Sequence, residues 1–178
     1  YMSTKAYPAK SSFLYAIIFG VIMVLEFVVM YAIGMKSLVH SSAGLIVNTA
    51  NYLILPVLFI FLGCYNYKNT SANGSISLNE CLKIGVSITC IAAFIYATFN
   101  VLFNILFPEF ITEMIDISKE AMMAKSPHLN TEELNKEISV MKKFMNPYIV
   151  FPVTLAMYSF FGLLYSLLIG AILKNKKS

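Results

Sequence analysis

Hydrophobic positions along the chain fall into four long runs, which are separated by more polar stretches. The runs cover residues 13–35, 43–66, 84–107 and 148–173. Three of them contain no charged residue, and the first contains only Glu26. A helix needs about 20 apolar residues, at about 1.5 Å each, to cross the hydrocarbon core of a bilayer. The pattern therefore predicts an all-α membrane protein with four transmembrane helices, forming a single domain over residues 1–178.

The stretch between the third and fourth runs, residues 108–147, has a helical rather than a continuous hydrophobic pattern. Apolar residues recur at helical spacing, and charged residues fill the opposite side. Ser126-Pro127 separates two such segments. Asn130 or Thr131 is expected to cap the second, because acidic residues follow in its first turn. We expect a two-helix amphipathic insert, which either lies against the bundle and the membrane interface or binds a partner.

Polar residues interrupt all four runs at a similar depth. Counting about 1.5 Å per residue from the middle of each run places five of them about 3–9 Å to the outer side. They are Glu26, Asn48, Asn51, Asn100 and Tyr158. A charge at the bilayer centre costs about 2.5–3.5 kcal/mol on insertion scales, so Glu26 is expected to face the bundle interior, water or a partner.

These five residues form a candidate intramembrane polar cluster, and two interpretations of it stay open. In the first, the cluster is a set of interhelical hydrogen bonds, worth about 0.6 kcal/mol each on average. In the second, it is a proton- or cation-responsive site that opens to the outside, since an acid inside a membrane is a functional candidate by default.

Small residues recur at every fourth position in the last run, at Gly162, Ser166 and Gly170. Small side chains at this spacing allow two helix backbones to approach closely. The three residues therefore predict a helix-packing stripe. The sequence does not decide whether the stripe packs within the bundle or across a homodimer.

Composition agrees with a membrane protein. Hydrophobic residues make up 58% of the chain and charged residues 12%, whereas a soluble domain carries about 25% charged residues. The net charge is +4, and every basic residue is a lysine. Recognition of phosphates and bases depends heavily on arginine. A nucleic-acid partner is therefore not expected, and the lysines are better explained as flanks of membrane spans.

The distribution of lysines predicts the orientation. Segments on the side of the N-terminus hold Lys5, Lys10, Lys68, Lys83, Lys174, Lys176 and Lys177. The opposite side has Lys36 in the first loop, and five lysines against seven acidic residues in 108–147. Because cytoplasmic loops are rich in lysine, both termini are expected in the cytoplasm. The first run is longer than the about 7–15 apolar residues of a signal peptide, so we expect it to remain as a span.

Catalytic motifs are missing from the sequence. It has no Walker A loop, GxGxxG, HExxH or GxSxG. The two histidines, His40 and His128, lack the spacing of metal ligands and are expected to be surface residues. Cys64, Cys81 and Cys90 form no CxxC pair and are expected to be reduced structural thiols. No catalytic residue, metal or cofactor is therefore predicted.

Four stretches carry a resemblance to a known family. They are NGSISLNECLKIG, NVLFNILFPEF, LNTEELNKEISVMKKFMNP and FFGLLYSLLIGAILKNKKS. Over roughly residues 10–177 the chain resembles a family of small bacterial membrane proteins, domain of unknown function 4199. The resemblance implies a four-span protein of the bacterial inner (cytoplasmic) membrane. It supplies no catalytic residues.

We therefore expect a multi-pass membrane protein that is not an enzyme and has an accessory, sensing or structural role. It would lie in the lipid bilayer. A second copy of the chain, in a homodimer, or another membrane protein would bind through the amphipathic insert. The alternative is a small dimeric transporter or channel that works around Glu26. A membrane-embedded enzyme acting on lipid would need a nucleophile and base, or metal ligands, at matched depth, and none is evident.

Overall fold

Helices make up nearly all of the described chain. The computed structural model describes residues 7–34, 42–70, 74–125 and 130–174. In chain order its elements are α1 (Pro8–Ser11), α2 (Phe13–Ile33), α4 (Ser42–Thr49), the π-helix η1 (Ala50–Ile54), α5 (Leu55–Thr70), α6 (Leu78–Leu106), α7 (Glu109–Lys125), α8 (Thr131–Phe144) and α9 (Pro147–Leu173). These ranges contain no strand, so the predicted all-α class is confirmed.

Four helical segments are long and apolar enough to cross a membrane. They are Phe13–Ile33, Gly44–Thr70, Leu78–Leu106 and Pro147–Leu173, the second of which runs through α4, η1 and α5. The four predicted runs are thus confirmed as helices of spanning length and composition. The histidines His40 and His128 lie outside the described residues.

The third of these helices begins earlier than predicted, at Leu78 instead of residue 84. Ser77 and Glu80 form a capping box, in which the Ser77 N–H donates to Glu80 Oε2 at 2.8 Å and the Glu80 N–H donates to Ser77 Oγ at 3.3 Å. This reciprocal pair satisfies backbone donors that a helix start leaves free. The hydropathy pattern predicts a later start because the first turn of the helix is polar.

The most extensive helix contact is between α6 and α9. Small residues let these two helices approach: Gly162 of α9 faces Thr89, and Gly85 of α6 faces Ser166. A Cβ on Gly162 would overlap the Thr89 hydroxyl and lie 3.0 Å from the Thr89 Cβ. Gly170 packs in the same way against Leu78 and Cys81. The predicted stripe therefore packs within the bundle, which is one of the two arrangements that the sequence allows.

A second apolar cluster attaches α7 to the bundle. Phe27 of α2, Phe103 of α6 and Phe110 of α7 form its centre, with Phe110 ring centroids 5.6 Å from Phe27 and 5.2 Å from Phe103. The edge-to-face geometry of these pairs is the one that aromatic quadrupoles favour. Ile117, two turns further along α7, is also buried. The first half of α7 is therefore held against α2 and α6.

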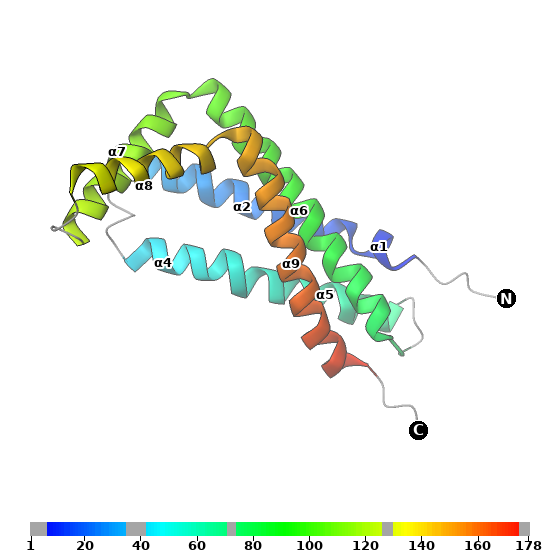
Figure 1. The fold of residues 1–178 in the computed structure, drawn as a ribbon. Coiled ribbons are helices and arrows are strands. Elements are labelled where there is room, and N and C mark those ends of the chain that lie inside the picture. The colour runs from blue at the N-terminus through cyan, green and yellow to red at the C-terminus, as the bar shows by residue number, and fades with distance from the viewer. Residues whose placement is uncertain (1–6, 35–41, 71–73, 126–129, 175–178) are drawn as a thin grey trace.

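Different helices lie at the two ends of the bundle. At one end, α1 packs on α5 and α6, and the Lys68 Nζ near the end of α5 donates to the Leu173 carbonyl of α9 at 3.0 Å. A lysine at the C-terminus of a helix stabilises its free carbonyls. Helices α7 and α8 lie at the opposite end (Figure 1).

Candidate intramembrane pocket

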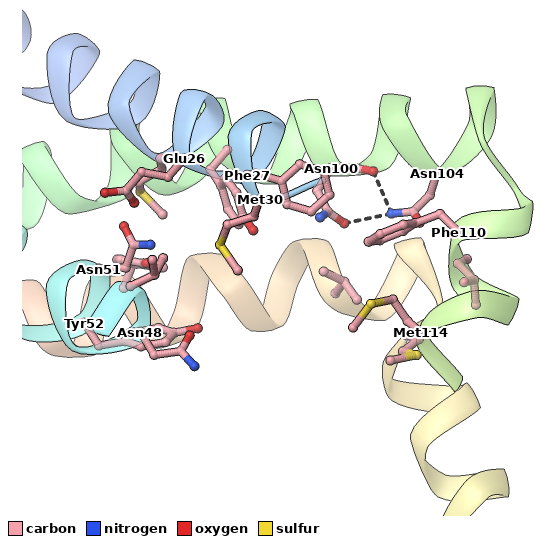
Figure 2. A pocket seen from close by; sticks show the side chains of 17 residues that line it. Glu26, Phe27, Met30, Asn48, Asn51, Tyr52, Asn100, Asn104, Phe110 and Met114 are labelled. Atoms are coloured by element: carbon pink, nitrogen blue, oxygen red, sulfur yellow. Dashed lines mark hydrogen bonds between the residues drawn. The ribbon is translucent and has the colours of Figure 1, made fainter. Parts of the chain in front are cut away.

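A pocket of about 320 Å³ lies between α2, the α4–η1 segment, α6, α7 and the first part of α9 (Figure 2). All five residues of the predicted polar cluster line it: Glu26, Asn48, Asn51, Asn100 and Tyr158. Tyr52, Tyr96 and Asn104 complete its polar lining. Its volume is within the range of sites for small organic ligands, about 300–1,000 Å³. The structure thus brings the predicted cluster to one cavity.

Glu26 and Asn51 face each other across this pocket (Figure 2). Glu26 Oε2 and Asn51 Oδ1 are both buried, and neither has a hydrogen-bond partner among the described residues. Asn51 also carries a donor, because a turn of its amide brings Nδ2 toward Glu26, and the two side chains lie within hydrogen-bonding reach. In the orientation of Figure 2, a buried acceptor without a partner costs about 1–3 kcal/mol. In that orientation the pair leaves room for an added N–H donor.

The π-helix η1 contains Asn51 and the next residue, Tyr52, which both line the pocket. Pro56 has no N–H, so it cannot donate to the Tyr52 carbonyl as an α-helix would require. The Tyr165 hydroxyl of α9 donates to that carbonyl instead, at 2.8 Å, and the Leu55 N–H bonds to the Ala50 carbonyl across five residues. Single π-turns of this kind are frequent at functional sites.

Asn100 and Asn104 bond mainly to each other. The Asn104 amide donates to the Asn100 carbonyl at 2.8 Å and to Asn100 Oδ1 at 2.9 Å. Both residues lie toward the α7 end of the pocket, away from Glu26 and Asn51 (Figure 2). The predicted single cluster therefore has two parts. One is an amide pair within α6, and the other contains the acid.

Aromatic rings form much of the wall near the acid. Tyr158 is only 2% exposed, and its ring stacks on Tyr52 with centroids 5.7 Å apart. Phe19 meets Tyr158 edge-on at 6.3 Å. Asn48, in contrast, is an exposed residue of the lining. The polar lining thus extends from an exposed edge at Asn48 to a buried tyrosine.

Helix α7 contributes Phe110, Ile111 and Met114 to the pocket, and the start of α9 contributes Val150. The same Phe110 is part of the aromatic cluster that holds α7 on the bundle. One wall of the cavity is therefore a helix outside the four spans. A ligand in the pocket would contact this wall directly.

Three polar lining residues were not in the predicted cluster. Tyr96 lies one turn before Asn100, so its i, i+4 spacing could have identified it. Asn104 lies one turn after Asn100, so the same i, i+4 spacing could have identified it. Tyr52 is adjacent to Asn51, and other adjacent residues, such as Glu26 and Phe27, also line the pocket. Its position next to Asn51 could therefore have suggested it.

Metal-binding and thiol chemistry have little support in the described residues. No group of three or more His, Cys, Asp or Glu side chains that could hold a metal occurs among them. Cys64 and Cys81 are buried free thiols, and Cys64 Sγ donates to the Cys81 carbonyl at 3.9 Å. Cys90 Sγ lies 2.9 Å from Ser159 Oγ. These contacts all join neighbouring spans and do not involve the pocket.

Comparisons with known proteins give one result. The model of a family described as a protein of unknown function, DUF4199, matches residues 14–175. No curated protein and no solved structure matches the chain.

Proposed function

The chain belongs to the DUF4199 family, and from this premise we propose that it is a non-enzymatic sensing or accessory component of a membrane. In this proposal a small ligand binds in the pocket around Glu26. Occupancy of the pocket then changes the position of α7 and α8, which contact a partner protein.

One observation carries the proposal: the pocket wall is shared between the spans and α7. The spans supply Glu26 and Asn51, whereas α7 supplies Phe110, Ile111 and Met114. A ligand that differs in affinity between two positions of α7 must shift the population toward the one it favours. Helix α8 follows α7 and carries a charged, exposed surface. In this proposal the partner contacts that surface.

The proposed location is the bacterial inner membrane, with both termini in the cytoplasm and α7 and α8 outside. Lysines support this orientation, because they lie at the end of the bundle opposite to α7 and α8: Lys10 in α1, Lys68 near the end of α5, Lys83 near the start of α6 and Lys174 directly after α9. The positive-inside rule assigns such an end to the cytoplasm. In this orientation the pocket opens toward the outside.

Thiol labelling of the pocket tests this function. Asn48→Cys in α4 should react with a membrane-impermeant thiol reagent added outside intact cells, because thiolates form and react in water. Ile46→Cys is the matched control, since Ile46 is 67% exposed at nearly the same depth but does not line the pocket. We expect the first cysteine to react at least about tenfold faster, given the apolar surroundings of the second.

Equal labelling rates for the two cysteines would contradict the proposal, because the pocket would then be no more accessible to water than the lipid-facing surface. Labelling only from the cytoplasmic side would contradict the orientation. The three native cysteines are buried or half-buried, and the unsubstituted chain measures their background reaction.

A small dimeric transporter or channel is the second candidate, because Glu26 is the one acidic or basic residue that lines the pocket in the part of the chain that the structure describes. Gly162, Ser166 and Gly170 pack against α6, so a dimer would have to form through another surface. In proteoliposomes, Glu26→Gln should abolish proton- or cation-coupled flux. Unchanged flux would exclude the transporter.

A further inference from the structure

The pocket has the size and charge of a site for an organic cation. Its volume of about 320 Å³ is roughly ten times the share of one water molecule in the liquid, about 30 Å³. Among the described residues that line the pocket, Glu26 is the only carboxylate, and no lysine or histidine is present. The complement of one carboxylate in an apolar surrounding is a ligand with a single positive charge.

The unpartnered oxygens indicate which kind of cation fits. Glu26 Oε2 and Asn51 Oδ1 are buried acceptors that face one another. A group that carries both a positive charge and N–H donors would satisfy the two together. Protonated amines have this property. Quaternary ammonium ions do not, because they lack an N–H.

The remaining wall fits an apolar or aromatic body attached to the amine. The rings of Tyr52, Tyr96 and Tyr158 line the cavity, and aromatic faces attract cations. Methionines of α2 and α7, Met30 and Met114, also line it. Their flexible, polarizable side chains adapt to irregular apolar ligands.

An inorganic cation fits less well. Calcium takes about 6–8 oxygen ligands at about 2.3–2.6 Å, whereas this pocket offers one carboxylate and has a mostly apolar wall. The Asn100 Oδ1, another candidate ligand, already accepts a hydrogen bond from Asn104. The donor set is therefore too sparse for a hard metal ion.

We propose that the pocket binds a monovalent organic ammonium ion with an apolar body. Its N–H groups would donate to Glu26 and Asn51, and its body would lie against Tyr52, Tyr158 and Met114. This inference rests on the proposed ligand-binding function and names the ligand class for the same pocket.

Calorimetric titration of the full chain in lipid nanodiscs tests the inference, with empty nanodiscs subtracted. The probe is phenethylammonium, and its neutral isostere is propylbenzene. We expect phenethylammonium to bind about tenfold to a hundredfold more tightly than propylbenzene, the ratio expected for hydrogen bonds to a charged group. Phenethyltrimethylammonium, which keeps the charge but lacks N–H donors, should bind with intermediate affinity.

Variants assign the effect to the pocket. Glu26→Gln should remove the preference for the charged probe, and Asn51→Ala should weaken it. Glu132→Gln is the control, because Glu132 is an exposed carboxylate on α8 outside the pocket. If Glu26→Gln fails to fold, Asn51→Ala alone carries the assignment.

Equal affinities for phenethylammonium and propylbenzene, or no binding of either, would overturn the inference. So would saturable competition by sodium, which would indicate an inorganic cation site. A different experiment tests the proposed function. That function is contradicted if a cysteine introduced at position 48 reacts no faster than one introduced at position 46. A reactive position 48 without ammonium binding would therefore reject the ligand class and retain the ligand-binding pocket.

Discussion

Replacing Gly162 with leucine is expected to destabilise the bundle by at least about 3 kcal/mol, the upper range for overpacking a core. A Cβ at this position already overlaps the Thr89 side chain, so a leucine must separate α6 from α9. The better helix propensity of leucine, worth about 0.8 kcal/mol over glycine, would offset only part of this cost. Thermal unfolding in detergent, followed by circular dichroism, measures the effect.

Ala171→Leu is the matched control, because Ala171 is exposed on the same helix. It adds a similar apolar volume without entering the contact, and it should leave the unfolding temperature nearly unchanged. Size-exclusion chromatography distinguishes the alternative. If Gly162→Leu kept the unfolding temperature and converted a dimer into a monomer, the stripe would be a dimer interface.

Removing the Phe27 ring is expected to release α7 from the bundle. Phe27 makes edge-to-face contacts with Phe99, Phe103 and Phe110, with ring centroids 5.0–5.6 Å apart. A buried Phe→Ala change costs about 3–5 kcal/mol, and here the loss falls on the cluster that holds α7. Trypsin should therefore cut faster after Lys119, an exposed residue of α7, because cleavage within a helix requires local unfolding.

Phe160→Ala controls for the loss of a phenylalanine, since Phe160 is 63% exposed. Its cleavage rate at Lys119 should equal that of the unchanged chain. If Phe27→Ala lowered stability without changing this rate, the aromatic cluster would not be what holds α7. Coupling between the pocket and α7 would then lose its structural basis.

Much of the fold could be predicted from the sequence, because a bilayer restricts the answer. An apolar run of spanning length must satisfy its backbone internally, which in one segment only a helix can do. The Asn130 cap of α8 was also predictable, since its side chain accepts from the Glu133 N–H at 2.8 Å in a standard capping box. Depth counting brought Glu26 and Asn51 to one layer because rise per residue is nearly constant in a helix.

Other features of the site depend on tertiary contacts that no local pattern carries. Pro56 interrupts the α-helical ladder at the Tyr52 carbonyl, and Tyr165, a residue of α9, supplies the missing donor. The pairing of Asn104 with Asn100 within α6, rather than with Glu26, depends on where the helices place these side chains. The attachment of α7 through Phe110 needs the relative positions of three helices.

Chemical modification of Glu26 in the unchanged chain tests the central claim, that this carboxyl group lines a ligand-accessible pocket. The protein in nanodiscs is treated with a water-soluble carbodiimide and an amine, and peptide mass spectrometry quantifies each modified carboxylate. Exposed Glu132 on α8 serves as the internal reference. We predict that Glu26 is modified and that saturating phenethyltrimethylammonium, which has no N–H and cannot itself form an amide, protects it but not Glu132. Full modification of Glu132 with none at Glu26 would contradict the account and indicate a dry interhelical network.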